Sequence, residues 1–161
     1  MTGPRRVKAD DRLAHSAAQR CRAYAACSEL LASPHDVDPR PALLGRIGLG
    51  DDWPAARGLE AWITALGESE LAPIRADYSG LFEVGDEGPP LPIRQALAPG
   101  AGAGCREEVV RFYEHFGYVL GAGHTWQPDH ASVELEFLHF LCYREAQAST
   151  AAEALPFQLA Q

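Results

Sequence analysis

Residues 126–143, WQPDHASVELEFLHFLCY, decide which fold this chain can adopt. The stretch opens with the turn Gln127-Pro128-Asp129 and continues as a helix. Asp129 is the expected N-cap, because a carboxylate there accepts bonds from the first backbone N–H groups and suits the positive end of the helix dipole. Apolar residues then recur at helical spacing and form one stripe: Val133, Phe137, Phe140 and Leu141, broadened by Leu138. We expect a deeply packed helix whose first turn carries Asp129, His130 and Glu134 next to Trp126.

Five further helical patterns precede this stretch, at residues 9–32, 41–47, 52–66, 68–82 and 105–120. Asp52 is the expected N-cap of the third pattern and Gly67 its C-cap. Pro73 should start or kink the fourth. The fifth pattern has its predicted buried stripe at Val109, Phe112, Phe116 and Val119. The helix that begins at Asp129 is expected to extend into the alanine-rich residues 146–154 and to end at Leu155-Pro156-Phe157.

Residues 85–104 differ from the rest, because two clusters of glycine and proline bracket the short segment 93–97. A loop of this length in a compact domain is usually functional or mobile. No segment shows the alternation and hairpin turns of β-strands. We therefore predict an all-α fold, with residues 1–161 forming a single-domain bundle of about six helices and one long Pro/Gly-rich loop.

Composition and charge exclude several classes of protein. The chain is 47% hydrophobic and 22% charged, which is typical of a soluble globular protein. No run approaches the ~20 apolar residues that a membrane span needs, and the charged residues after Arg5-Arg6 do not fit a signal peptide. The net charge of −8 argues against nucleic acid and is compatible with a basic peptide. Four cysteines, without metal-site or disulfide-framework spacing, are interpreted as free thiols: Cys21, Cys27, Cys105 and Cys142.

The sequence contains weak signals for three kinds of chemical site: a metal site, a cysteine nucleophile and a phosphate-binding loop. His130 and Glu134 share a helix face, with His124 and His139 near in sequence, but no established metal-ligand pattern surrounds them. A cysteine paired with a histidine lacks any nucleophile signature, and the glycine-rich residues 100–104 lack the lysine and preceding strand of a phosphate loop. We predict no catalytic residue, metal or cofactor. An acidic helical domain with a long loop is better suited to bind a peptide, its apolar run in a groove and its arginines on carboxylates.

The turn Pro128-Asp129-His130, followed by Glu134-Leu135-Glu136-Phe137, closely resembles the signature of the TorD/DmsD/NarJ family. Those proteins are cytoplasmic all-helical chaperones dedicated to molybdenum-cofactor enzymes of the dimethyl sulfoxide reductase type. Three further stretches are similar to the family: Tyr78-Ser79-Gly80-Leu81-Phe82, the loop Gly88-Pro89-Pro90, and the helix of residues 107–113.

The resemblance implies a cytoplasmic chaperone that binds the N-terminal leader, often twin-arginine, of a molybdoenzyme catalytic subunit. It would hold the apoenzyme until the cofactor is inserted, before twin-arginine export. Asp129 and His130 match the leader-binding pair, and Pro128 shapes their turn. The remaining candidate site residues are Trp126, Tyr78, Phe82 and Glu134. The alternative is a small helical metalloprotein or enzyme that uses His130 and Glu134.

Two departures from the family pattern add expectations. Leu91-Pro92-Ile93-Arg94 stands where the family has a tyrosine and an acid after its prolines, so binding there should differ in detail. Members typically continue for a few dozen residues beyond the signature helix, and those C-terminal helices are missing here. We therefore expect exposed helix faces to be covered by a second copy or by the client, as a homo-oligomer or a stable complex.

Overall fold

The computed structural model describes residues 9–46, 56–85, 88–121 and 127–161, and this part of the chain is built from helices. The α-helices are α1 (Ala9–Leu31), α2 (Arg40–Arg46), α3 (Ala56–Glu68), α4 (Leu71–Phe82), α5 (Cys105–His115), α6 (Ala131–Gln147) and α7 (Ala151–Leu159). A 3₁₀-helix, η1, spans Gln95–Leu97. An isolated antiparallel β-bridge joins Arg94 and His130. The all-α prediction is confirmed, with seven α-helices where about six were expected.

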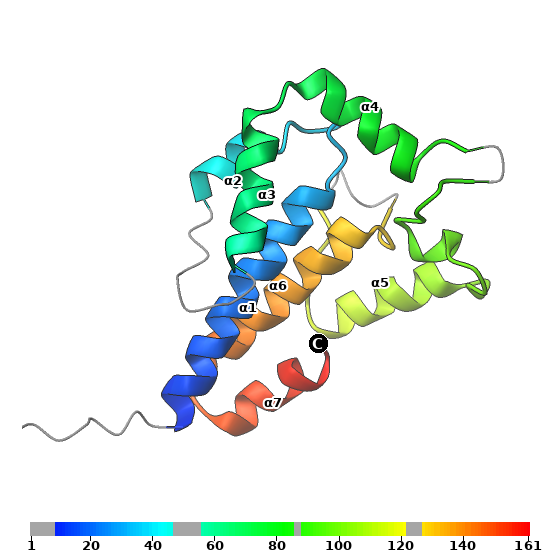
Figure 1. Cartoon of the computed structure of the whole chain (residues 1–161). Helices are drawn as coiled ribbons and strands as arrows, with labels where there is room; N and C mark the ends of the chain where they lie inside the picture. The colour runs from blue at the N-terminus through cyan, green and yellow to red at the C-terminus, as the bar shows by residue number, and fades with distance from the viewer. Residues whose placement is uncertain (1–8, 47–55, 86–87, 122–126) are drawn as a thin grey trace, which may run out of the picture.

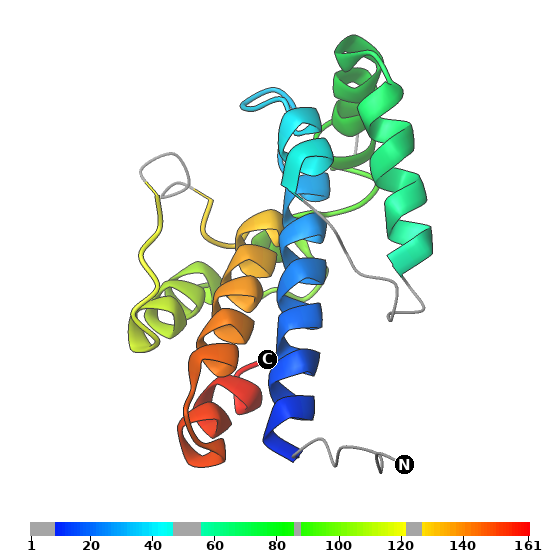
Figure 2. The same ribbon diagram turned by 90° about the vertical axis from the view of Figure 1, so that its left-hand side faces the viewer.

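Helices α1 and α6 form the centre of the molecule, side by side and running in opposite directions (Figures 1 and 2). Ala17 and Ala26 are fully buried on α1, and Leu141 and Cys142 are fully buried on α6. Small side chains on α1 let the two helices approach closely, and the larger side chains of α6 fill the space between them. The long helix at residues 9–32 is thus confirmed, together with its end before Ser33-Pro34.

Two apolar clusters lie on opposite sides of this central pair. On one side Ala26, Leu43 and Ile63 join α1 to α2 and α3. On the other side the aromatic cluster joins α5 and α6 through Tyr113, Val133, Phe137 and Leu141. Phe137 is its hub, with ring centroids 4.7 Å from Tyr113 and 5.4 Å from Tyr118. Val133, Phe137 and Leu141 of the predicted stripe are buried on α6, whereas Phe140 and Leu138 are only partly buried and pack against this cluster.

Helix α5 ends five residues earlier than predicted, because Gly117 adopts φ +71° and stops it. The Gly117 N–H donates to the Glu114 carbonyl and the Tyr118 N–H to the Tyr113 carbonyl, which is a Schellman ending. The stripe predicted for this helix was wrong in two of its members. Phe112 and Val119 are 44% and 85% exposed, and the residue buried on α5 is Tyr113.

The last predicted helix is in fact two. Ala148 leaves the helical conformation, and Thr150 begins α7 by accepting a bond from the Glu153 N–H. Leu155-Pro156-Phe157 does not end a helix, because Pro156 lies inside α7. Phe157 packs near Phe116, and the Arg144 guanidinium lies over the Phe157 ring. These contacts hold α7 against α6 and α5.

Gly67 in α3 acts differently from the prediction, whereas Pro73 lies at the start of α4, as predicted. Gly67 lies within α3, where a Cβ would meet the Leu44 side chain at 2.6 Å. Close packing against α2, rather than a C-cap, therefore explains this glycine. Pro73 lies in the first turn of α4, where its missing N–H would have no intrahelical partner anyway. The predicted N-cap Asp52 falls outside the described residues.

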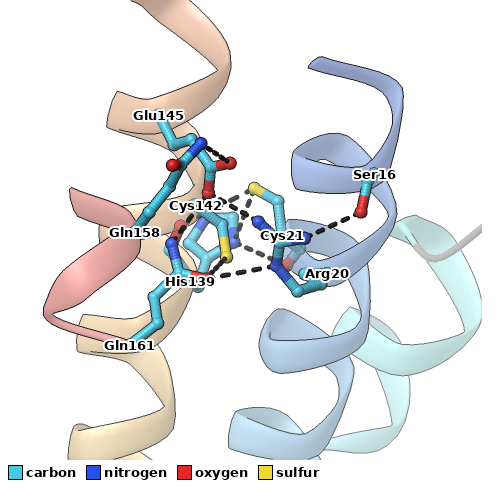
Figure 3. A network of polar contacts seen from close by, with 8 residues as sticks. All are labelled: Ser16, Arg20, Cys21, His139, Cys142, Glu145, Gln158 and Gln161. Carbon is cyan, nitrogen blue, oxygen red and sulfur yellow. Dashed lines mark hydrogen bonds and ion pairs between the residues drawn. The ribbon is translucent and has the colours of Figure 1, made fainter. Parts of the chain in front are cut away.

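A polar network around the buried Glu145 carboxylate joins α1 and α6 to α7 and the residues that follow it (Figure 3). The Glu145 carboxylate accepts bonds from Arg20, Gln158 and Gln161, at 2.6, 3.0 and 2.9 Å. Burial alone would raise the pKa of Glu145, but the bonds from Gln161, Arg20 and Gln158 outweigh it and lower that pKa. The charged side chain is thus satisfied at the centre of a three-helix contact. All four cysteines are free thiols, including Cys142 beside this network.

Candidate functional site

The Pro128-Asp129-His130 turn lies at the start of α6 and is buried. Asp129 is 1% exposed and His130 is 6% exposed. The N-cap of α6 is His130, whose Nδ1 accepts a bond from the Ser132 N–H at 3.2 Å. The prediction that Asp129 caps this helix was therefore wrong, because the Asp129 carboxylate has partners outside α6.

Asp129 connects the turn to the long loop. Its Oδ2 accepts a bond from the Ala96 backbone N–H at 3.0 Å, and its carbonyl accepts one from the Gln95 N–H at 2.9 Å. Its Oδ1 lies 3.3 Å from the Arg106 Nε in the first turn of α5. One carboxylate thus holds η1 and the beginning of α5 together. The energetic reason is that a buried carboxylate needs such donors to offset its lost hydration.

His130 connects the same turn to α4 and α1. Because the Ser132 N–H donates to Nδ1, a neutral ring carries its proton on Nε2, which lies 3.1 Å from the Tyr78 hydroxyl oxygen. The Tyr78 hydroxyl can then donate to the Leu31 carbonyl at 3.4 Å. Burial, followed by the negative charges of Glu83 and Asp36, raises the pKa of Tyr78 to about 12. The phenol therefore stays protonated and available as a donor.

Backbone groups complete the attachment of the turn. The Ala131 N–H donates to the Ile93 carbonyl at 2.8 Å, and the Tyr113 hydroxyl donates to the Pro128 carbonyl at 2.9 Å. The Ser28 hydroxyl donates to the Ser132 carbonyl at 2.7 Å. The turn is thereby bonded to α1, α4, α5 and the loop before η1. Pro128, Asp129, His130 and their neighbours thus hold together segments that lie far apart in the sequence.

A hollow of about 390 Å³ opens beside this turn, and we call it the Tyr78 hollow. Its lining includes Tyr78 and Phe82 of α4, Ile93 before η1, Leu97 of η1, and His130. The rings of Tyr78 and Phe82 are 5.0 Å apart. Ionisable residues also line the hollow: Asp36, Glu83, His35 and Arg94. Its chemistry is that of an aromatic and aliphatic surface with two carboxylates, an imidazole and a guanidinium around it.

The predicted site residues are only partly brought together. Tyr78, Phe82 and His130 line the Tyr78 hollow, whereas Pro128 and Asp129 are buried behind it. Glu134 lines a different hollow, between α5 and α6. Trp126 and His124 lie outside the described residues. Among the described residues, no group of three or more histidine, cysteine, aspartate or glutamate side chains is arranged to hold a metal ion.

Several residues that build this site were missed from the sequence. Four side chains bond the turn or its neighbours: Ser132, Ser28, Tyr113 and Arg106. In addition, the Ile93 carbonyl accepts a bond from the backbone N–H of Ala131, next to the turn. Ser132, three positions after the expected cap Asp129, was the one local signal, since side chains at a helix start often bond to each other and to N–H groups there. The remaining partners come from distant positions and carry no local signal.

Comparisons with known proteins agree on one family. The model of the family described as "Nitrate reductase delta subunit" matches residues 50–161. A chlorate reductase assembly chaperone protein of Ideonella dechloratans is 38% identical over 97 residues, which cover 58% of this chain and 49% of that protein. A selenate reductase assembly chaperone protein of Thauera selenatis is 34% identical over 90 residues, which cover 54% of this chain and 47% of that protein. The chain thus spans about half the length of these two relatives.

One solved structure supports the fold. A protein described as a redox enzyme maturation protein, from Archaeoglobus fulgidus, superposes with a TM-score of 0.55 over 87% of this chain and 90% of that chain. At 20% identity this likeness concerns the fold alone. No helix among the described residues is long and apolar enough to cross a membrane.

Proposed function

The chain belongs to the nitrate reductase delta subunit family, and from this membership we propose that it is an assembly chaperone for the catalytic subunit of a molybdenum oxidoreductase. The family match, together with two relatives named as assembly chaperone proteins, is the observation that carries the proposal. In this role the protein acts in the cytoplasm and binds a client without catalysing a reaction. The client is of the dimethyl sulfoxide reductase type and is held before cofactor insertion and twin-arginine export.

The Tyr78 hollow is the surface that we assign to the N-terminal leader of the client. Tyr78, Phe82 and Ile93 offer apolar area to the apolar run of a leader, and Asp36 and Glu83 offer carboxylates to its basic residues. A peptide that combines both features gains burial of its apolar part and charge-assisted bonds from its arginines. This combination supports leader binding better than it supports a purely apolar ligand.

Asp129 and His130 then act mainly by holding in place the residues that line the Tyr78 hollow. Asp129 is 1% exposed, and its carboxylate is already bonded to Ala96 and near Arg106. His130 lines the hollow but uses both ring nitrogens within the protein, toward Ser132 and Tyr78. A change at Asp129 should thus displace η1 and the loop that carries Ile93 and Leu97, and in that way alter the leader site.

The rival reading is a metalloprotein or enzyme built on His130 and Glu134. Those two side chains line different hollows, and the ring nitrogens of His130 already have partners. Elemental analysis of the purified protein separates the two functions. Zinc or iron in stoichiometric amount, lost together with His130→Ala, would favour the rival.

The direct test is mild affinity purification of this protein from its native host during respiratory growth, with mass spectrometry of what accompanies it. We expect a large molybdopterin-binding catalytic subunit in stoichiometric amount. Phe82→Ala and Glu83→Gln should each reduce that recovery, since both side chains line the Tyr78 hollow. Removal of the client's N-terminal leader should reduce it to a similar degree.

Matched variants control for general effects on α4. Leu81 is exposed and adjacent to Phe82, and Asp77 is an exposed carboxylate on the same helix, and neither lines the hollow. Leu81→Ala and Asp77→Asn should therefore leave client recovery unchanged. Recovery of the protein alone, or equal losses in all four variants, would contradict the proposed leader site.

A further inference from the structure

A second hollow lies between α5 and α6, and we call it the α5–α6 groove. Its volume is about 380 Å³, and it shares no lining residue with the Tyr78 hollow. Its apolar lining includes Val109, Phe112, Phe137 and Leu138, and Ala160 follows α7 at one end. Two carboxylates line it as well, Glu108 from α5 and Glu134 from α6.

The apolar lining of the α5–α6 groove is partly open to solvent. Phe112 is 44% exposed, although its ring packs 5.2 Å from Phe116 and 5.7 Å from Phe137. Phe137, in contrast, is buried beneath it. An aromatic ring held in place by two others offers a rigid apolar surface, and such a ring loses little conformational entropy when a ligand covers it.

Glu134 is the unusual member of this groove. It is half-buried, and within the described ranges its carboxylate has no hydrogen bond and no ion pair. Burial, followed by the negative charge of Asp129, raises the pKa of Glu134. Asp129 itself is supplied with donors by Ala96 and Arg106, so these donors are engaged elsewhere. Among the described residues, this half-buried carboxylate in a groove lined by aromatic rings thus has no ion-pair partner.

The combination of lining residues identifies what would fit. A cation from a ligand would offset the lost hydration of Glu134 and also meet Glu108 across the groove. Arginine suits such a place better than lysine, because its planar guanidinium has five donors and stacks on aromatic rings. The apolar lining requires that the residues next to this arginine be apolar.

We propose that the α5–α6 groove binds a second segment of the client, an apolar segment that carries an arginine, in addition to the leader. The arginine pairs with Glu134 and Glu108, and its apolar neighbours cover Phe112 and Leu138. This inference rests on the proposed chaperone function for the identity of the client. It adds that the client is held at two separate surfaces, on either side of the Pro128-Asp129-His130 turn.

The test uses the full chain and two short synthetic peptides, a leucine-rich helix former with one arginine and its twin with norleucine in that place. The arginine peptide should bind about tenfold more tightly, as expected for a hydrogen bond between charged groups. Glu134→Gln should abolish this preference, and Phe112→Ala should weaken the binding of both peptides. Glu114→Gln is the matched control, because Glu114 is an exposed carboxylate on α5 that does not line the groove.

Cysteine labelling locates the bound peptide. Cys105 lines the α5–α6 groove, whereas Cys27 lies on α1 and lines neither hollow. The arginine peptide should slow the alkylation of Cys105, measured by mass spectrometry of digested protein, and leave that of Cys27 unchanged. Unprotected Cys105, or an arginine preference that survives Glu134→Gln, would overturn the proposal. Peptide binding that is lost with Phe82→Ala instead would assign the peptide to the Tyr78 hollow.

Further outcomes separate this inference from the proposed function. Normal client recovery with both wild type and Glu134→Gln would leave the chaperone function standing and refute the groove. Arginine-dependent binding without any recovered client would support a peptide groove and refute the proposed function. Self-association that Phe112→Ala abolishes and that the peptide cannot displace would mean that a second copy occupies the groove, which also refutes the proposal.

Discussion

The Tyr78 hydroxyl oxygen lies 3.1 Å from the Nε2 of His130, in a contact that joins α4 to the start of α6. Tyr78→Phe removes this bond and the one to Leu31, and should lower the free energy of unfolding by about 1 kcal/mol. Urea unfolding checks this value. A double-mutant cycle with His130→Ala should give a coupling of similar size, whereas additive effects would mean that the bond contributes nothing.

Asp129→Ala should cost more stability than the loss of a helix cap. The buried carboxylate bonds the Ala96 N–H and lies near Arg106, so its removal leaves donors without partners at η1 and α5. We expect a loss of about 2–3 kcal/mol, compared with about 1 kcal/mol for Asp129→Asn, which keeps an acceptor for Ala96. Thermal unfolding measures both, and equal losses would argue against the role of the charge.

Glu134→Gln should stabilise the protein at neutral pH. The folded state raises the pKa of Glu134, first by burial and then through Asp129, so ionisation of this group opposes folding. Its contribution to stability is present below the pKa of the unfolded chain, about 4.3, and is lost as pH rises through the higher folded pKa.

The gain from Glu134→Gln should stay below about 1 kcal/mol, because the groove is open to solvent. It should disappear on acidification, which urea unfolding at several pH values can follow. A gain that is constant with pH would contradict this origin. The substitution that stabilises the fold is also the one expected to abolish arginine recognition in the α5–α6 groove.

Arg20→Met should destabilise the contact between α1, α6 and α7. It leaves the buried Glu145 carboxylate with only the two glutamine donors, and because Arg20 is partly exposed we expect a loss of about 2 kcal/mol. The folded state lowers the pKa of Glu145, so in the wild type this stability is present above the unfolded pKa and is lost as pH falls through the folded pKa. Arg20→Met should therefore reduce the acid-dependent part of the unfolding free energy.

Gly117→Ala should cost about 1 kcal/mol, because φ +71° strains a residue with a Cβ even though open space surrounds it. Gly102→Ala is the matched control, since Gly102 has no positive φ and also has no neighbour near its Cβ position. Urea unfolding compares the two. An equally small effect at both positions would show that the Schellman ending of α5 is not needed.

Local patterns in the sequence predicted the helices well where the pattern and the packing coincide. The stripe Val133, Phe137, Leu141 is buried because its spacing matches the face that meets α1 and α5. The ends of helices were predicted less well, although their signals were present. Gly117 stops α5, and Thr150 with Glu153 starts α7, but a continuous apolar and alanine-rich pattern obscured both.

The site was predictable only in part, since its geometry depends on distant residues. The Pro128-Asp129-His130 turn indicated the correct family. No local pattern could reveal that the Asp129 carboxylate turns away from its own helix toward Ala96, or that His130 meets Tyr78. For the same reason Glu134 was grouped with His130 by spacing, although the two side chains line separate hollows.

The pairing of α1 with α6 has a consequence for how the protein folds during its synthesis. The Ser28 hydroxyl bonds a carbonyl 104 positions downstream, and Arg20 bonds a carboxylate 125 positions downstream. At translation rates of roughly 5–20 residues per second, α1 leaves the ribosome several seconds before its partner α6. During that interval the side chains that will form the centre of the molecule are exposed. A protein proposed to protect nascent enzymes thus depends, for its own folding, on a helix that is synthesised about a hundred residues after α1.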